Sequence, residues 1–209
     1  MLINSSSYGP LNNHSVKRIK ETLGKALQEY PRTLVLRVDL RLPDSDFSFY
    51  SDDSTLMTRF IVSLKAQISA DLRRKEKAGH RVHHCRVRFV WAREFCEGYK
   101  KHYHLVLLFN KDTYAYPGTY FKKEGEYKHN LSLMIMEAWG RTLNKVLPDN
   151  SELFYPLVEF PDNGYYHLNV NSESFDSDLR VVIARASYLA KIYSKDYTDG
   201  KRCFSCSQF

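Results

Sequence analysis

The sequence contains few cysteines and no long apolar run. Its four cysteines, Cys85, Cys96, Cys203 and Cys206, are too few and too scattered for a disulfide framework, which favours a reducing compartment. The first 15 residues lack the apolar stretch of a secretory signal, and no run approaches the roughly 18 apolar residues of a membrane-spanning helix. We therefore expect a cytoplasmic protein without a membrane partner.

Acidic residues are outnumbered by basic ones, and the sequence has neither an internal repeat nor a low-complexity segment. The 31 lysines and arginines exceed the 24 acidic residues by 7. This balance favours an anionic partner, of which nucleic acid is the commonest. A length of 209 residues with 43% hydrophobic residues suits one compact domain. We expect a polar lead over residues 1–13 and a single domain over residues 14–209.

Hydrophobic periodicity predicts an α+β fold. A period near 3.6 indicates helices over residues 14–29, 54–77, 131–146 and 177–195. Alternation indicates strands over 33–42, 86–94 and 102–109, with another strand within 154–160 or 165–170. A central antiparallel sheet of four to five strands in ferredoxin-like order, with helices packed on one face, satisfies this order with short connections.

Two histidines stand one residue apart at the start of the third predicted strand. His102 and His104 share a face because strand side chains alternate, and the odd-numbered neighbours form the more continuously apolar face. In the preceding strand Glu94 falls on the face opposite the apolar set. If both apolar faces meet the same helices, a hairpin whose paired residue numbers sum to 196 or 198 sets Glu94 beside His102 or His104. In a bulged hairpin, Glu97 would replace Glu94.

Two imidazoles and a carboxylate form a three-ligand site for a divalent metal with open positions. This mixed nitrogen and oxygen set suits Mn²⁺ or Zn²⁺, and holds Mg²⁺ less tightly. The alternative interpretation is that His102 and His104 are solvated residues at a strand end. A second histidine group at 80, 83 and 84 lacks a carboxylate, and the Cys203/Cys206 pair lacks a partner pair, so neither predicts a metal site.

The last predicted helix carries a tyrosine flanked by lysines. Indexing at 100° per residue places an apolar stripe on one side, and Tyr188, Lys191 and Lys195 within an arc roughly opposite. The ammonium groups would favour the phenolate, which makes Tyr188 a candidate nucleophile, or they would neutralise a phosphate. The alternative is an exposed tyrosine between solvated lysines.

These motifs together resemble a known class. The HYH motif, Glu94 and the YLAK motif resemble the HUH (His-hydrophobe-His) nucleases that initiate rolling-circle replication. The segments VWARE…HYHLVLLFN, EYPRTLVLRVDLR and SYLAKIYSKDYTDGKRCF are more closely similar to the YagK/YfjJ C-terminal domain family, which is related to inovirus replication proteins and occurs in prophages. The resemblance covers the chain from about Val16 to Phe204.

The resemblance implies an HUH-type endonuclease that nicks and rejoins single-stranded origin DNA or an origin hairpin in the bacterial cytoplasm. His102, His104 and Glu94 would hold Mg²⁺ or Mn²⁺, Tyr188 would become linked to the 5′ phosphate, and Lys191 would assist it. A host replication helicase is an expected partner. Position 192 is Ile where two-tyrosine enzymes have a second tyrosine, which implies a single nucleophile and a structural role for Tyr193.

DNA contacts are expected from basic residues that follow phosphates without reading bases. We expect one group near the end of the second helix and the hairpin tip, and Lys195 beside the nucleophile. The group consists of Arg73, Arg74, Lys75, Lys77, Arg81, Lys100 and Lys101. The alternatives are a solvated face for these residues and, for the whole protein, a non-nicking DNA-binding regulator of a phage or prophage element. An RNA-binding sheet would need exposed aromatic residues that the predicted open face lacks.

Overall fold

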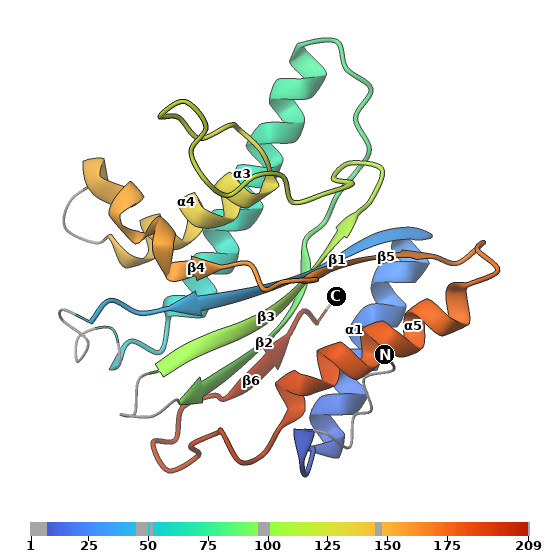
Figure 1. Ribbon diagram of the computed structural model, residues 1–209, viewed down its shortest axis with the longest axis vertical. Coiled ribbons are helices and arrows are strands. Elements are labelled where there is room, and N and C mark those ends of the chain that lie inside the picture. The colour runs from blue at the N-terminus through green and yellow to red at the C-terminus, as the bar shows by residue number, and fades with distance from the viewer. Residues whose placement is uncertain (1–7, 45–49, 51, 96–100, 145–147, 209) are drawn as a thin grey trace.

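The computed structural model describes residues 8–44, 50, 52–95, 101–144 and 148–208, and it has an α+β fold (Figure 1). This confirms the predicted class. No helix within these ranges is long and apolar enough to cross a membrane. The elements in chain order are α1 (Asn13–Glu29), β1 (Arg32–Arg41), α3 (Leu56–Lys77), β2 (Arg88–Phe95), β3 (Lys101–Asn110), α4 (Leu131–Leu143), the 3-10 helix η3 (Pro148–Leu157), β4 (Val158–Glu159), β5 (Tyr165–Asn169), α5 (Phe175–Ala186), the 3-10 helix η4 (Ser187–Ala190) and β6 (Phe204–Cys206).

The sheet has six strands in the described ranges, and all of its pairings are antiparallel. The order β4-β1-β3-β2-β6 contains the predicted ferredoxin-like arrangement, and β6 adds an edge strand that periodicity did not indicate. Both candidate segments after α4 form strands, and both pair with β1. A tight turn separates them. Position 164 in this turn requires glycine, because a Cβ there would lie 2.5 Å from the carbonyl oxygen of Pro161.

One face of the sheet packs against α3 and α4. Alternate apolar side chains of β1 and β3, such as Leu36 and Leu107, are buried there with α3 and α4. Phe60 of α3 and Trp139 of α4 meet edge to face, with ring centroids 5.8 Å apart. The indole nitrogen of Trp139 donates to the Arg41 carbonyl 2.9 Å away, which fixes α4 over the end of β1.

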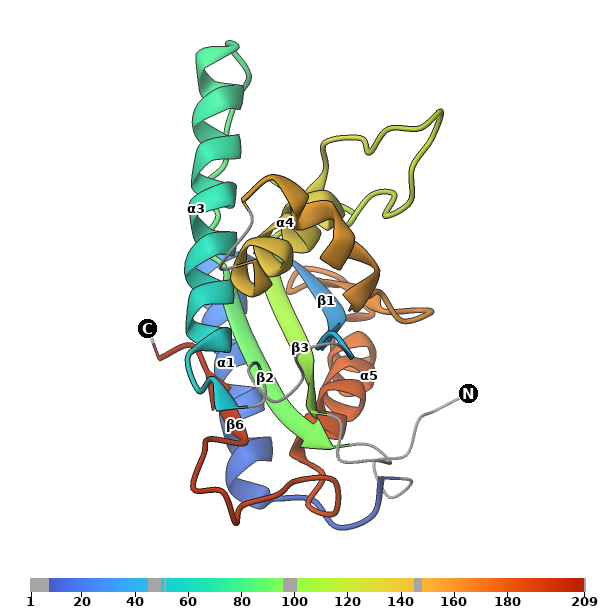
Figure 2. The same ribbon diagram turned by 90° about the vertical axis from the view of Figure 1, so that its left-hand side faces the viewer.

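The opposite face carries the histidines and is also covered by helices. Figures 1 and 2 show α1 and α5 on this side, away from α3 and α4. Ile19 and Leu23 of α1 and Val182 of α5 pack with Val90 and Val106 of the sheet. The expectation of helices on one face alone was therefore wrong, because the apolar stripes of α1 and α5 find a second apolar patch among the even-numbered residues of β2 and β3.

The last helix ends earlier than predicted. α5 stops at Ala186, η4 follows, and Lys191 leaves the helical region with φ −53° and ψ 142°. The physical reason is pairing with the start of the chain. Asn12 donates its N–H to the Ala190 carbonyl at 2.8 Å, and Ile192 donates to the Pro10 carbonyl at 3.2 Å. These bonds replace the helical ones, so the predicted helix over 187–195 was wrong.

Candidate metal and nucleophile site

The β2–β3 hairpin brings Glu94 to the two histidines. Glu94 stands directly opposite His102, and His104 stands opposite Ala92. The paired numbers sum to 196, which is one of the two predicted registers. Because all three side chains occupy positions of the same parity in this register, they lie on the same face of the sheet. Glu97, the alternative ligand, lies outside the described residues.

Glu94, His102 and His104 form a compact donor set. Their ligand atoms all lie within 4.8 Å of one another, and no other group of three or more such side chains occurs in the described part of the chain. The Nε2 atoms of His102 and His104 are 3.1 Å apart. Two nitrogens that bind one ion at about 2.1 Å and a right angle lie about 3.0 Å apart. The residues therefore fit a divalent cation.

Asp39 of β1 supports this arrangement from behind. Its Oδ1 lies 2.7 Å from Nδ1 of His104, which leaves Nε2 directed toward Glu94 and His102. A carboxylate on the second ring nitrogen is the usual partner of a metal-binding histidine. Sequence periodicity put Asp39 on the polar face of β1, but the pairing of Asp39 with His104 required the β1–β3 register.

Glu94 is buried among cationic side chains. Glu94 is 2% exposed. The Nζ of Lys191 lies 2.9 Å from its Oε2, and the Nζ of Lys195 lies 3.3 Å from its Oε1. Burial alone would raise the pKa of Glu94, but His104 and the two lysines outweigh burial and lower that pKa to about 2. Glu94 is thus a carboxylate at neutral pH.

His104 lies between two carboxylates. Burial would lower its pKa, but Asp39 at 2.7 Å and Glu94 at 3.5 Å favour the charged ring and raise the pKa. Asp39 responds in the opposite sense, and its pKa is lowered mainly by His104 against the effect of burial. A cation at Nε2 would replace the proton there, so the same two carboxylates that stabilise imidazolium also stabilise a bound metal.

Tyr188 of η4 lies beside the donor set. Its ring meets His104 edge to face with centroids 5.1 Å apart, and the Nζ of Lys191 lies 3.4 Å from the Tyr188 ring centroid. The guanidinium carbon of Arg37 lies 5.1 Å from the same centroid. The structure thus brings together Glu94, the histidines, Tyr188 and Lys191, which come from three separate parts of the chain.

The lysines beside Tyr188 do not lie on an outward face. Lys191 is buried, and the side chain of Lys195 is 1% exposed and donates to the Lys191 carbonyl at 2.6 Å. Lys195 therefore lies inside the site, whereas it was expected to contact DNA from a surface. Tyr193, expected to be structural, is 70% exposed. Both differences follow from the end of α5 at Ala186, because helical indexing no longer applies beyond it.

The remaining basic residues do not form one cluster. Lys101 is 2% exposed and donates to the Tyr50 carbonyl at 3.0 Å, close to the start of α3. Arg73 and Lys77 lie at the other end of this 22-residue helix, which is roughly 33 Å long at 1.5 Å per residue. Figure 2 shows that end of α3 extending beyond the sheet. The expected grouping was wrong, and Lys100 lies outside the described residues.

Within the group at the end of α3, two members are paired with an acidic residue of the same helix. Arg74 and Lys75 lie 2.5 and 2.8 Å from the carboxylate of Asp71. Arg73 and Lys77 are exposed, and Arg81, also exposed, lies beyond the helix. At 1.5 Å per residue, Arg73 and Lys77 lie about 26 and 32 Å from the start of α3, so they are far from Lys101.

Tyr8 was missed by sequence reasoning. Its ring lies edge to face against Tyr188, with centroids 5.3 Å apart. Tyr8 belongs to the polar lead, which carries no periodicity, and the contact joins residues at opposite ends of the chain. The pairing of residues 10–12 with residues 190–192 creates this contact, and no local sequence signal could have indicated it.

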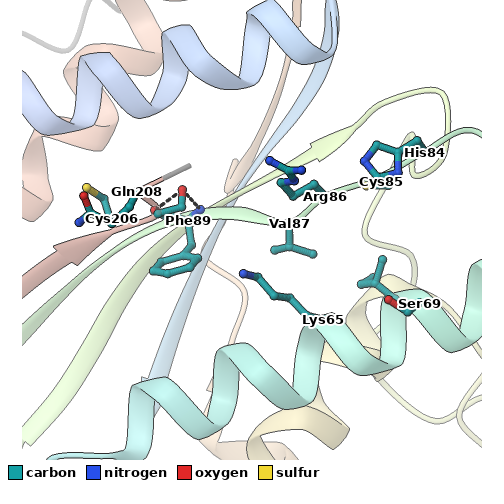
Figure 3. A pocket seen from close by; sticks show the side chains of 11 residues that line it. Lys65, Ser69, His84, Cys85, Arg86, Val87, Phe89, Cys206 and Gln208 are labelled. Carbon is teal, nitrogen blue, oxygen red and sulfur yellow. Dashed lines mark hydrogen bonds between the residues drawn. The ribbon is translucent and has the colours of Figure 1, made fainter.

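A pocket of about 610 Å³ lies elsewhere, between α3 and the segment that leads into β2 (Figure 3). Figure 3 shows Lys65 of α3 directed toward Phe89, whose ring centroid is 5.8 Å from the lysine Nζ. Ser207 closes one side through hydrogen bonds with the Phe89 backbone. None of the residues around the donor set lines this pocket, so it is separate from the candidate site.

Comparison with known proteins places the whole chain in one family. Residues 2–207 match the model of the YagK/YfjJ C-terminal domain. The chain is 35% identical over 197 residues to the uncharacterized protein YagK of Escherichia coli K12, covering 91% of this chain and 90% of YagK. It is 32% identical over 199 residues to the uncharacterized protein YfjJ of the same strain, covering 91% and 92% of the two chains. No solved structure matches. The chain belongs to the YagK/YfjJ C-terminal domain family.

Proposed function

We propose that the protein is an HUH-type endonuclease and strand transferase that nicks and rejoins single-stranded origin DNA. One observation carries the proposal, namely the position of Tyr188 beside the donor set of Glu94, His102 and His104. The ring centroids of Tyr188 and His104 are 5.1 Å apart. A nucleophile beside a three-ligand metal site suits metal-assisted phosphoryl transfer to a tyrosine.

The reaction joins the Tyr188 oxygen to phosphorus and breaks the bond between phosphorus and the 3′ oxygen. The Tyr188 proton passes to solvent, the freed 3′ oxygen takes up a proton, and the DNA remains attached through a 5′-phosphotyrosine bond. Attack of a 3′ hydroxyl on this bond reverses the step and rejoins a strand. Because the covalent bond conserves the free energy of the phosphodiester, rejoining needs no further energy source.

Glu94, His102 and His104 would hold the divalent cation, for which we propose Mg²⁺ or Mn²⁺. When bound, it supplies positive charge at a phosphate oxygen and at the leaving oxygen. Asp39 keeps His104 in the orientation that presents Nε2. Two imidazoles favour Mn²⁺ over Mg²⁺ by ligand softness.

Cationic side chains support a phosphate beside Tyr188. Lys191 contacts both the Tyr188 ring and Glu94. Burial disfavours its charge, but these two contacts outweigh burial and raise the Lys191 pKa, so the ammonium persists at neutral pH. Arg37 is 8% exposed, and its Nε has no hydrogen-bond partner in the described ranges. A phosphate oxygen would satisfy this buried donor.

The proposal is tested with labelled single-stranded oligonucleotides that tile the DNA around the protein's own coding sequence. With Mn²⁺ or Mg²⁺ we expect one oligonucleotide to be cleaved and its 5′-phosphate side to migrate with the protein on a denaturing gel. Tyr188→Phe should abolish this adduct because the attacking oxygen is lost. The exposed Tyr193→Phe is the matched control and should retain it. A full adduct in Tyr188→Phe would contradict the assignment.

A second candidate function is a non-nicking DNA-binding regulator of a phage or prophage element. Lys191 and Lys195 neutralise Glu94 without any metal, and this closed network favours the alternative. Metal-independent binding with no adduct on any tiled oligonucleotide would support it. A host replication helicase as partner and a location in the bacterial cytoplasm stay predictions that accompany the nickase.

A further inference from the structure

A second cavity, of about 760 Å³, lies near the turn end of the β2–β3 hairpin, on the face opposite Glu94. Its wall is contributed by the residues around the start of α3, by β2 and β3, and by residues 200–202. The lining residues are Asp53, Ser54, Met57, Thr58, Trp91, Arg93, Lys101, Tyr103, Gly200, Lys201 and Arg202. Its size is within the range of small-molecule sites.

Strand alternation separates this cavity from the candidate metal site. Arg93 immediately precedes Glu94, and Lys101 immediately precedes His102, so each pair points to opposite sides of the sheet. Arg93 and Tyr103 are cross-strand partners, as are Glu94 and His102. The same hairpin therefore serves two sites, one on each face.

Four cationic side chains line the cavity, against one acidic side chain. Arg93 and Lys101 are each 2% exposed, and buried cations of this kind are costly without an anion nearby. Two bonds of 2.5 and 2.7 Å join Arg93 to Asp199, but its Nε has no partner in the described part of the chain. The acidic residue, Asp53, is bonded at 2.8 Å to Arg59. Lys201 is likewise bonded at 3.1 Å to Asp52. The four lining cations still outnumber the three acidic residues Asp52, Asp53 and Asp199, so the cavity has an excess of positive charge.

The same cavity has an aromatic and apolar wall. Trp91 and Tyr103 meet edge to face there, with ring centroids 6.0 Å apart, and Met57 of α3 lies beside them. An inorganic anion would use only the cationic part of this lining. A ligand that carries both a phosphate and a planar ring would use all of it, because bases pack on aromatic side chains and phosphates bind arginine and lysine.

We propose that this cavity binds a phosphate-bearing nucleotide, either free or as one unit of a single-stranded DNA chain. Arg93 and Lys101 form its inner cationic wall, and Lys201 and Arg202 close the phosphate end. The site is independent of nicking, since none of its lining residues belongs to the donor set or contacts Tyr188 in the structure.

Intrinsic fluorescence reports on this site directly. The chain has two tryptophans. Trp91 lines the cavity, whereas Trp139 of α4 is fully buried and does not line it. The Tyr188→Phe protein is titrated in EDTA with thymidine 5′-monophosphate, thymidine, inorganic phosphate and an eight-residue oligothymidylate. EDTA and the missing hydroxyl exclude the metal site and cleavage, so the result does not depend on the proposed function.

We expect a saturable change in Trp91 emission with the monophosphate or the oligonucleotide, and at least tenfold weaker binding of thymidine. Equal affinity for monophosphate and oligonucleotide identifies a free nucleotide as the ligand, and binding of the oligonucleotide alone identifies a DNA unit. Thymidine that binds as tightly as the monophosphate would overturn the proposal, as would inorganic phosphate that binds as tightly, or the absence of saturable change in every arm.

Variants at the exposed end of the cavity locate the binding. Lys201→Ala combined with Arg202→Ala should weaken binding at least tenfold, because two phosphate contacts are lost. Lys122→Ala combined with Lys123→Ala removes two adjacent exposed lysines of a loop outside the cavity and should leave affinity unchanged. Equal affinity in the two double variants, with far-ultraviolet circular dichroism showing both folded, would overturn the assignment to this cavity.

Discussion

Asp39 determines which nitrogen of His104 faces the donor set. Its carboxylate lies 2.7 Å from Nδ1, so Nε2 remains available beside Glu94 and His102. Asp39→Asn removes the negative charge that increases the basicity of the ring, and we expect the affinity for Mn²⁺ to fall 10- to 100-fold. Titration followed by electron paramagnetic resonance of free Mn²⁺ measures this change.

The matched control for Asp39 is Asp112→Asn, which removes a carboxylate that pairs with Arg32 at the surface. Its Mn²⁺ affinity should equal that of the unaltered protein. If Asp39→Asn binds Mn²⁺ as tightly as this control, then His104 is not a ligand in the orientation described.

Lys191 has two effects that a single substitution separates. Its ammonium lies 2.9 Å from Glu94 Oε2, where it competes with a metal, and 3.4 Å from the Tyr188 ring centroid, where it would support a phosphate beside Tyr188. Lys191→Met should therefore raise Mn²⁺ affinity while slowing adduct formation at least tenfold. Adduct assays at saturating Mn²⁺, together with Mn²⁺ titrations, measure both effects.

Exposed Lys17 of α1 provides the comparison, since Lys17→Met removes one lysine that is not among the ion-pair partners of Glu94 and should change neither quantity. A fall in Mn²⁺ affinity in Lys191→Met would show that Lys191 supports Glu94 more than it competes with the metal. Unchanged adduct formation would show that Lys191 does not act on Tyr188.

The sequence predicted the ligands better than the residues that support them. Glu94, His102 and His104 could be placed on one face because a strand repeats every two residues, and the hairpin limited the register to two choices. Asp39 lies 65 residues before His104, and Tyr8 lies 180 residues before Tyr188. Contacts over such separations depend on strand pairing and chain packing, which local periodicity does not contain.

At the scale of elements, α3 is joined to the loop that follows β3 by one buried carboxylate. Asp71 is 2% exposed. It accepts from Tyr114 at 2.7 Å and from His129 at 2.9 Å, and it also pairs with Lys75. Burial would raise the pKa of Asp71, but these hydrogen bonds and charges outweigh burial and hold the pKa far below its usual value.

This network predicts a pH-dependent stability. The folded pKa is depressed, so the stabilisation is present above the unfolded pKa of about 3.9 and is lost as the pH falls toward the folded value. Asp71→Asn should lower the free energy of unfolding by about 1 to 3 kcal/mol at pH 7. It should also lose less stability than the unaltered protein between pH 4 and pH 3.

Urea denaturation at pH 7, 4 and 3 measures both effects of Asp71→Asn. Asp162→Asn, which removes an exposed carboxylate from the turn between β4 and β5, is the control and should leave both unchanged. An equal loss of stability on acidification in Asp71→Asn and the unaltered protein would contradict the account of this network.

The boundaries of an element were predictable where local periodicity determines them. They were not predictable where pairing with a segment distant in the sequence ends the element. The helix α1 and the strands β1, β2 and β3 begin and end within two residues of the predicted bounds. The last helix was predicted nine residues too long, because residues 10–12 pair with residues 190–192 and replace its hydrogen bonds. The strand β6 has three residues, too few for alternation to reveal.

At the scale of the whole molecule, the sheet separates two cores and two candidate sites. The face with α1 and α5 carries the donor set and Tyr188, and the face with α3 and α4 carries the cationic cavity. Composition predicted an anionic partner but not where its phosphates lie. The sequence suggested one basic cluster, whereas the length of α3 separates its basic end from the hairpin, and the buried cations Arg93 and Lys191 are the ones at the sites.

The central claim is that Tyr188 attacks phosphorus, and mapping the covalent adduct tests it most directly. Trypsin cuts after Arg185, Lys191 and Lys195, so Tyr188 and Tyr193 fall in different peptides, residues 186–191 and 192–195. Mass spectrometry after nuclease digestion should find the added nucleotide phosphate on the peptide 186–191 and only when Mn²⁺ or Mg²⁺ was present. Attachment to the peptide 192–195, or to any other residue, would contradict the account.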